Sequence, residues 1–330
     1  MRIGVDVMGG DLGPAEVIAG AREACELIGP DDRIVLVGDR AIIEGCLAEA
    51  DDVDSRLEIH HAEQTIGMAE SPVEALRNKP RSSISQMAEL HRAGELDGCI
   101  SSGNTGACVA AAQMRLGRLP NVARPGIAVI APTFKGGVAI CDVGANVNCR
   151  PQHLHQYAVM TSLYVNAVTG IETPRVGLLS VGEEEGKGND LVKATRMLLE
   201  ADPHINFIGN VESRDLVSGI CDVMICEGFV GNVVLKLIEG LGAGLMKGLL
   251  GRLASIMPDQ IGLIKKAAHE IKVMYDFNEY GGAPLLGIAG IWIICHGASN
   301  ATGIKNAVRA VKEFASHKVN EQITQLLSEA

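Results

Sequence analysis

Short apolar segments alternate with helical patterns along almost the whole chain, and this alternation limits the possible folds more than any other feature of the sequence. Residues 2–7 form the first apolar segment, and a glycine-rich turn and a helical pattern over residues 15–27 follow it. Comparable strand-like segments recur at residues 33–38, 57–60, 96–100, 126–131, 138–143, 176–181, 205–208 and 223–226. Strands separated by helices predict an α/β fold: a doubly wound, mostly parallel sheet in three α/β/α layers.

The composition is consistent with a single α/β catalytic domain over residues 1–330. The chain has 47% apolar residues, enough for one large core or two smaller ones, and 39 glycines against 3% aromatic residues indicate many tight turns. The formal net charge of −11 argues against nucleic acid as a partner. The sequence shows no signal-peptide pattern and no apolar run of membrane-spanning length, so we expect a cytoplasmic protein.

Nine cysteines are scattered along the chain without a C-x-x-C pair. Neither a disulfide framework nor a metal site is therefore expected. Most of the cysteines lie in apolar segments, where a small buried side chain is the simplest interpretation.

Five polar, glycine-rich turns follow predicted strands. They lie at residues 6–11, 101–105, 142–146, 183–189 and 227–232. Because ligands of doubly wound sheets bind at the carboxyl ends of the strands, we expect these turns to share one rim. Asn and Gly also suit left-handed turns without any ligand, so each turn alone has a structural explanation, whereas five together favour a site.

The turn that precedes an Ala-rich helical pattern has the features of an anion site. Free backbone N–H groups and the positive end of a helix attract anions, and Ser102, Asn104 and Thr105 add side-chain donors beside Gly103. Lys187 lies between two glycines, where a ligand can approach closely. No strand is followed by G-x-G-x-x-G, and the glycine-lysine pair lacks the other residues of a Walker loop. A single phosphate therefore fits better than ATP or NAD.

A series of motifs occurs in order along nearly the whole chain: DVMGGD (6–11), SSGNTGA (101–107), DVGAN (142–146), GEEEGKGN (182–189), GNVESRD (209–215), CEGFVGNVVLK (226–236), EYGGAPLLG (279–287) and CHGASN (295–300). Together they resemble the PlsX family, the bacterial phosphate acyltransferases of phospholipid synthesis. Val7 and Ser102 are small departures, at positions where alanine is expected in the family.

The resemblance implies that the chain transfers a long-chain acyl group from acyl carrier protein to inorganic phosphate and forms acyl phosphate. It implies a homodimer, a fold similar to phosphotransacetylases and isocitrate-type dehydrogenases, and a product consumed by a membrane glycerol-3-phosphate acyltransferase. The expected location is then the cytoplasm, peripherally at the inner face of the cell membrane. Two other functions stay open: a short-chain phosphotransacetylase that uses coenzyme A, and a non-catalytic membrane-associated scaffold.

This chemistry assigns roles to the polar turns. The enzyme must hold phosphate without blocking its attacking oxygen, and it must stabilise the oxyanion formed at the thioester carbonyl. The candidates are Ser102, Gly103, Asn104, Thr105, Lys187 and Asn189 for phosphate, Lys187, Asn104, Asn232 and His296 for catalysis, and Asn146 for orientation. His296 is a candidate acid for the leaving thiol, although a structural histidine at a helix start explains it equally well.

An acyl-cysteine intermediate is the alternative to direct attack by phosphate. Cys108 and Cys149 lie near the expected rim, but neither has a histidine or lysine neighbour in sequence that would form a thiolate. Direct attack is the favoured mechanism.

Four carboxylates near an anion need a separate explanation. They are Asp6, Asp11, Asp142 and Glu183. They either orient Lys187 from a second layer or bind Mg²⁺. We favour orientation, so no metal and no other cofactor is predicted.

Residues 237–274 depart from the α/β pattern and predict an amphipathic helical hairpin broken at Pro258. An apolar residue recurs at every fourth position of its first half, among several glycines whose cost packing or an interface must compensate. The hairpin is either a core or dimer element, or an apolar edge that touches the membrane surface. The membrane contacts would be Leu245, Leu249, Leu253 and Met257.

Docking of an acidic carrier protein to this acidic chain needs local basic residues. Two clusters are candidates: Arg77, Lys79 and Arg81 around Pro80, and Arg115, Arg118 and Arg124 around Pro120. A solvated charged loop also explains either cluster.

Overall fold

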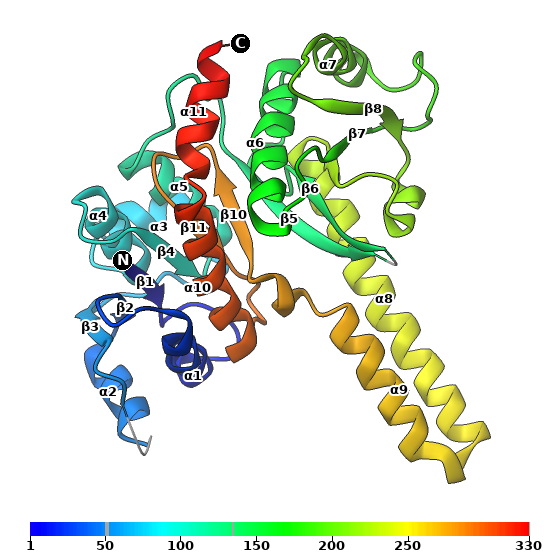
Figure 1. The fold of residues 1–330 in the computed structure, drawn as a ribbon. Helices are drawn as coiled ribbons and strands as arrows, with labels where there is room; N and C mark the ends of the chain where they lie inside the picture. Colours follow the sequence, from blue (N-terminus) through cyan, green and yellow to red (C-terminus); the bar gives the residue numbers. More distant parts are fainter. Residues whose placement is uncertain (50–52, 134, 330) are drawn as a thin grey trace.

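One sheet of eleven strands runs through the computed structural model, which describes residues 1–49, 53–133 and 135–329 (Figure 1). The strands are β1 (Arg2–Asp6), β2 (Arg33–Gly38), β3 (Leu57–His61), β4 (Gly98–Ser101), β5 (Gly126–Thr133), β6 (Gly136–Cys141), β7 (Arg175–Leu179), β8 (Asn206–Val211), β9 (Val223–Ile225), β10 (Ala283–Leu286) and β11 (Trp292–Ile294). Their order across the sheet is β3-β2-β1-β4-β11-β10-β5-β6-β9-β7-β8. The predicted α/β fold with a mostly parallel sheet is confirmed.

Two parallel blocks of strands run in opposite directions within this sheet. The first block is β3-β2-β1-β4-β11, and the second is β6-β9-β7-β8. Between them, β10 is antiparallel to both β11 and β5, and β5 is antiparallel to β6. The carboxyl ends of the two blocks therefore lie at opposite edges of the sheet. The expectation that all five polar turns share one rim was wrong for this reason.

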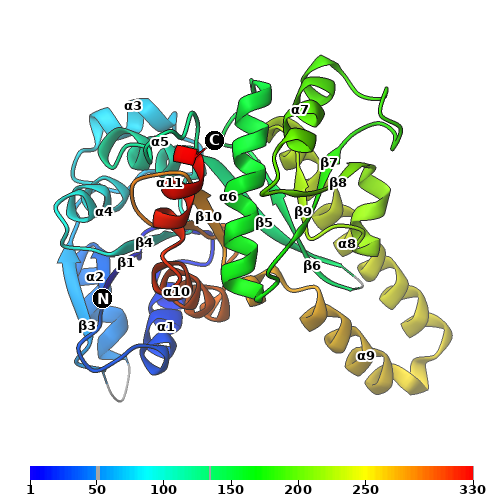
Figure 2. The same cartoon turned by 45° about the horizontal axis from the view of Figure 1, so that its top comes forward.

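Helices cover both faces of the sheet. The helices are α1 (Pro14–Ala24), α2 (Arg40–Ala48), α3 (Pro72–Asn78), α4 (Ser83–Arg92), α5 (Thr105–Arg115), α6 (Pro151–Thr169), α7 (Asp190–Ala201), α8 (Gly228–Ile256), α9 (Ile261–Met274), α10 (Ala301–Ser316) and α11 (Val319–Glu329). Short 3₁₀ turns lie at Cys25–Leu27, Ser213–Ser218, Pro258–Gln260 and Phe277–Tyr280. Helix α10 packs against α1 and α6 on one face, and α5 packs against α3 and α4 on the other (Figures 1 and 2).

Strand β2 illustrates how the sequence fills a hydrophobic core on each face. Ile34 and Leu36 belong to one core and Val35 and Val37 to the other, because successive side chains of a strand point to opposite faces. All four side chains are buried. A strand buried on both faces reads as a continuous apolar run, which is the pattern that the sequence shows.

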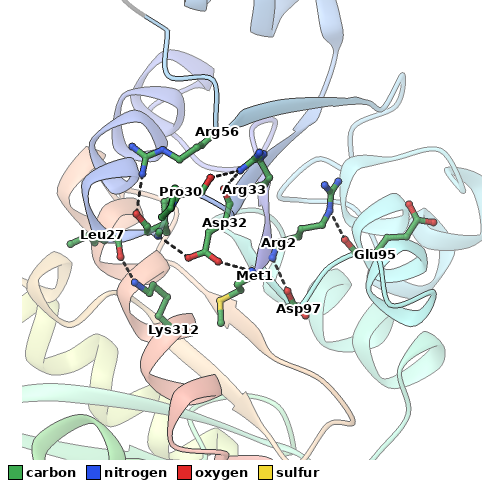
Figure 3. A network of polar contacts seen from close by, with 12 residues as sticks. Met1, Arg2, Leu27, Pro30, Asp32, Arg33, Arg56, Glu95, Asp97 and Lys312 are labelled. Carbon is green, nitrogen blue, oxygen red and sulfur yellow. Dashed lines mark hydrogen bonds and ion pairs between the residues drawn. The ribbon is translucent and has the colours of Figure 1, made fainter.

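A network of polar contacts fixes the amino-terminal ends of the first strands (Figure 3). The backbone N–H of Arg2 donates to Asp97 Oδ2 (2.6 Å), and Arg2 Nε donates to the carbonyl oxygen of Glu95 (3.0 Å). Lys312 of α10 donates to the carbonyl oxygen of Leu27. These contacts fix the amino-terminal ends of β1 and β4. The turns at the carboxyl ends of both strands are therefore held in fixed positions.

The predicted helical hairpin is formed by α8 and α9, which pack against each other and project from the body of the molecule (Figures 1 and 2). Leu245 and Leu249 are 64% and 54% exposed. Leu253 and Met257 are only half-buried rather than exposed, since the apolar repeat turns slowly around the helix. None of the described helices is long and apolar enough to cross a membrane.

Candidate active site

The turns that follow β1, β4 and β11 lie together at one edge of the sheet. We call residues 7–11, 102–104 and 296–299 the Ser102 turns. The N–H of Asp11 donates to the carbonyl oxygen of Gly297 (2.7 Å), which joins the first turn to the third. A β-carbon at Gly9 would lie 2.6 Å from the backbone nitrogen of Gly103, so only glycine allows the first turn to approach the second this closely.

The buried side chain of Asp6 connects two of the Ser102 turns through hydrogen bonds. Its side chain is 2% exposed and accepts hydrogen bonds from Ser101 Oγ (2.7 Å) and from the N–H of Met8 (3.1 Å). Burial raises the pKa of Asp6, and hydrogen bonds from Ser83 and Ser101 act in the opposite direction. This carboxylate therefore positions the turns, and it does not contact Lys187.

Ser102 has a buried hydroxyl without a hydrogen-bond partner among the described residues. The side chain is 1% exposed and lies shortly before the start of α5. Its Oγ lies beside Gly10 of the first turn. A buried polar atom is nearly always hydrogen-bonded in a folded protein, and this hydroxyl is left with an unused donor. The first turn of α5 adds backbone N–H groups and the positive end of the helix dipole.

Asn104 does not offer its side chain to a ligand, in contrast to the prediction. Its amide Nδ2 donates to the carbonyl oxygens of Gly67, Met68 and Glu70 at 3.0 to 3.2 Å, and its Oδ1 accepts from the N–H of Ala107 (3.0 Å). Asn104 is the cap of α5 and clamps the preceding loop. Thr105, the first residue of α5, is exposed.

His296 and Asp11 lie at the open side of the Ser102 turns. Both side chains are exposed. The ring of His296 packs against Phe277 with 5.0 Å between centroids, and its Nδ1 accepts from the N–H of Ala298 (3.1 Å). The Nε2 atom makes no hydrogen bond to a described residue.

The turns that follow β6, β7 and β9 form a second cluster at the opposite edge. We call residues 142–146, 180–189 and 226–232 the Lys187 turns. Asp142 is fully buried and accepts from the N–H groups of Ile127 (3.0 Å) and Asn146 (2.7 Å). Burial raises its pKa, and these N–H donors lower it. Asp142 thus shapes its own turn.

Asn146 is also used within the protein. Its Nδ2 donates to the carbonyl oxygen of Pro125 (2.6 Å) and to Tyr157 Oη (2.9 Å). Asn232 differs, because its half-buried side chain makes no hydrogen bond to a described residue and its Cβ lies 4.0 Å from the β-carbon position of Gly144. Asn232 is therefore the amide available to a ligand here.

Lys187 is exposed, and none of the described carboxylates lies within ion-pair distance of its Nζ. Its aliphatic chain lies over Gly182, where a β-carbon would be 3.0 Å from Lys187 Cγ. Glu183 is exposed and does not pair with Lys187, so the predicted orienting role is not supported.

Several other residues of this loop make contacts within the protein. The carbonyl of Glu184 accepts from Asn210 Nδ2 (3.1 Å), and Glu185 pairs with Arg196 (3.4 Å). Asn189 Oδ1 accepts from the N–H of Val192 (3.0 Å) and caps α7. Ser180 Oγ and Asn210 Oδ1 lack partners among the described residues. No role was predicted for Ser180 or for Asn210, although Asn210 lies in the motif GNVESRD (209–215).

Ser102 and Lys187 of one chain do not meet. β4 and β7 are six positions apart in the sheet, which separates them by about 29 Å at the usual spacing of neighbouring strands. The two strands also run in opposite directions, so their turns open at opposite edges. A lysine side chain cannot span this distance.

The two cysteines near these turns are poor nucleophiles. Cys108 lies fully buried in α5, and burial raises the pKa of its thiol to about 12. Burial raises the pKa of Cys149 to about 11, and its Sγ donates to the carbonyl oxygen of Asn146 (3.5 Å). Both thiols are protonated at neutral pH.

Half of the predicted docking residues form ion pairs with carboxylates. Lys79 pairs with Glu70 (2.5 Å), Arg81 pairs with Glu63, and Arg115 pairs with Glu89 (3.0 Å). Arg77, Arg118 and Arg124 are exposed and make no ion pair with a described residue. Arg118 donates instead to the carbonyl oxygen of Ala123.

Comparison with known proteins gives a consistent result. A family model described as "Fatty acid synthesis protein" matches residues 1–322. The chain is 45% identical to the phosphate acyltransferase of Nitratidesulfovibrio vulgaris (strain DP4), over 98% of this chain and 94% of that protein. It is 46% identical to the phosphate acyltransferase of Desulforamulus reducens, over 95% of this chain and 93% of that protein.

Solved structures with a similar fold include two phosphotransacetylases. The enzyme from Streptococcus pyogenes superposes with a TM-score of 0.63 at 17% identity, over 96% of this chain and 94% of that one. The EutD phosphotransacetylase from Staphylococcus aureus gives a TM-score of 0.61 at 15% identity, over 95% and 94%. These likenesses establish the fold.

Proposed function

The chain belongs to the PlsX family of phosphate acyltransferases, enzymes of fatty acid and phospholipid synthesis, and from this membership we propose how its two sets of turns carry out the reaction. A phosphate oxygen attacks the thioester carbonyl of a long-chain acyl-acyl carrier protein. The carbon–sulfur bond breaks, acyl phosphate forms, and the released pantetheine thiolate takes up a proton.

The Ser102 turns bind inorganic phosphate. The observation that carries this assignment is the buried Ser102 hydroxyl, which lacks a partner among the described residues at the start of α5. Hydroxyl and backbone N–H donors neutralise a phosphate dianion without a full positive charge that would quench its attacking oxygen. The side chain of Asn104 takes no part, because it is occupied as a cap.

Lys187 and Asn232 stabilise the oxyanion that forms at the thioester carbonyl. Both carry donors that no described residue uses, which leaves them available in the ground state. Donors of this kind contribute about 100- to 1,000-fold in rate each. The Nε2–H of His296 at the Ser102 turns donates a hydrogen bond to the leaving thiolate, which takes its proton from solvent.

These donors come together across a homodimer. Since about 29 Å of sheet separates Ser102 from Lys187 in one chain, the phosphate bound by one subunit meets Lys187 of the partner subunit. A two-fold symmetric pair then contains two complete sites, each built from the Ser102 turns of one chain and the Lys187 turns of the other.

The α8–α9 hairpin brings the enzyme to the cytoplasmic face of the membrane, where a glycerol-3-phosphate acyltransferase receives the acyl phosphate. Leu245 and Leu249 support this role, because large apolar side chains of a projecting helix need a partner. The glycines of α8 at residues 240, 242, 244, 248 and 251 have open space around them, so packing within this chain does not compensate their helical cost.

The direct test is phosphate-dependent release of free carrier protein from palmitoyl-acyl carrier protein. We expect release to require inorganic phosphate and to produce palmitoyl phosphate in equal amount. The fold similarity to phosphotransacetylases favours one competing function, acetyl transfer from coenzyme A. Turnover of acetyl-coenzyme A with no turnover of the palmitoyl carrier would support that function instead.

A further inference from the structure

A basic cleft of about 820 Å³ lies at the amino-terminal end of α6. Its lining contains four basic side chains, Arg118, Arg124, Arg150 and His153, and no carboxylate. None of the three arginines makes an ion pair with a described residue. In a chain with a net charge of −11, this is an unusual concentration of uncompensated positive charge.

The first turn of α6 strengthens the positive field of the cleft. This helix of 19 residues begins at Pro151, so the positive end of its dipole adds to the arginines. His153 Nδ1 accepts from the N–H of Arg150 (3.2 Å). Burial lowers the pKa of His153, and the nearby Arg124 and Arg150 lower it further. The cleft therefore favours an anion that the chain itself does not provide.

The cleft adjoins the turns that carry Asn232. Cys149, which lines the cleft, donates to the carbonyl of Asn146 (3.5 Å), and the same carbonyl accepts from the N–H of Gly228 (2.8 Å) at the start of α8. Asn232 lies one turn further along α8. A ligand anchored in the cleft can thus extend along residues 146–149 to the proposed oxyanion donors.

We propose that this cleft binds the phosphate group of the phosphopantetheine arm that carries the acyl thioester. The inference rests on the proposed function. It names the part of the acyl donor that binds next to the Lys187 turns. Planar guanidinium groups bind phosphate in a bidentate manner, and the amides of Gln113 and Asn148 in the lining match the polar amides of the arm. The attacking phosphate has its own place at Ser102, so the cleft is left to the acyl donor.

Binding of free 4′-phosphopantetheine, measured by calorimetry, tests the cleft without any turnover. We expect Arg124→Gln and Arg150→Gln each to weaken binding by about 10- to 100-fold. Arg309→Gln is the matched control, because Arg309 is an exposed arginine of α10 that makes no ion pair with a described residue. Dephosphorylated pantetheine should bind weakly to all variants alike. Equal binding of 4′-phosphopantetheine to wild type and both cleft variants overturns the proposal.

Kinetics identify which substrate the cleft serves. Two acyl donors are compared, acyl-phosphopantetheine and acyl-acyl carrier protein. For each donor, the cleft variants should raise KM by about 10- to 100-fold and change kcat by less than about twofold. Their KM for inorganic phosphate should match wild type. A raised KM for inorganic phosphate alone would make the cleft the nucleophile site. A raised KM for acyl-acyl carrier protein with an unchanged KM for acyl-phosphopantetheine would mean that the cleft binds the acidic surface of the carrier protein. Either result contradicts the proposal.

This inference and the proposed function fail in different ways. If wild type binds 4′-phosphopantetheine through Arg124 and Arg150 but forms no acyl phosphate, the cleft assignment stands and the reaction is wrong. If acyl phosphate forms normally in both cleft variants with unchanged KM values, the reaction stands and the cleft assignment is wrong.

Discussion

At the scale of single residues, the proposed phosphate site depends most on Ser102, and the substitution of this residue separates function from stability. A buried hydroxyl without a partner costs about 1–3 kcal/mol in the folded protein. Ser102→Ala should therefore leave the free energy of unfolding unchanged or raise it, while it raises KM for inorganic phosphate by about 10- to 100-fold. Chemical denaturation and steady-state kinetics on the same preparation check both parts. Normal phosphate kinetics in this variant would remove Ser102 from the site.

Asn104 should behave in the opposite way, because its side chain is fully used inside the protein. Removing a helix cap and three donor bonds predicts a loss of about 2–4 kcal/mol of unfolding free energy in Asn104→Ala. Urea denaturation measures this loss. Wild-type stability combined with selective loss of phosphate binding would show instead that Asn104 contacts the ligand.

Cys149 tests direct attack against an acyl-cysteine route. Burial raises the pKa of this thiol to about 11, so it carries no thiolate that could serve as a nucleophile at neutral pH. Cys149→Ser should keep kcat within about twofold of wild type. Mass spectrometry during turnover should detect no acyl adduct on Cys149. A stable adduct together with an inactive Cys149→Ser variant would establish the covalent route.

Sequence alone could locate the polar turns but not divide their residues between ligand and structure. Asn104 and Asn189 stand directly before helices, and a side chain at that position serves either as a cap or as an anion donor. Both turned out to be caps. The lone hydroxyl of Ser102 and the grouping of Arg118 and Arg124 with Arg150 depend on packing between separate segments, which no local pattern encodes.

At the scale of elements, the strand segments could be predicted well but their directions could not. The predicted segments at 33–38 and 223–226 agree with β2 and β9 within one residue. The two short strands β10 and β11 were not predicted as strands, and together with the β5–β6 pair they reverse the direction of the sheet. Strand direction is set by pairing between distant segments, so periodicity within a segment carries no signal of it.

The α8–α9 hairpin is the element whose role can be tested separately from chemistry. Leu245→Glu and Leu249→Glu place charges on its exposed apolar side and should abolish sedimentation of the protein with anionic lipid vesicles. With acyl-acyl carrier protein as the substrate and no vesicles present, the kcat of both variants should stay within about twofold of wild type.

Met197→Glu is the matched control for the hairpin variants. Met197 is 71% exposed on α7, away from the hairpin, so its substitution adds the same charge elsewhere on the surface. The control should bind vesicles like wild type. Equal vesicle binding by wild type, control and hairpin variants would exclude the hairpin as the membrane contact.

At the scale of the whole molecule, the single continuous sheet is the reason for proposing a site shared between two chains. The Ser102 turns and the Lys187 turns are fixed to strands of the same sheet, and its hydrophobic cores prevent a large change in their separation. A second subunit related by two-fold symmetry can supply the missing donors to both sites at once.

The measurement that tests this account most directly is complementation between Ser102→Ala and Lys187→Ala. Each variant alone should lose most of its activity at phosphate concentrations below KM. When both are co-expressed, half of the dimers are mixed, and each mixed dimer has one site with both residues intact. The account predicts recovery of about a quarter of wild-type activity, since sites are shared across the dimer. If the co-expressed variants are no more active than the two variants assayed separately, Ser102 and Lys187 act within one chain, and the shared site is wrong.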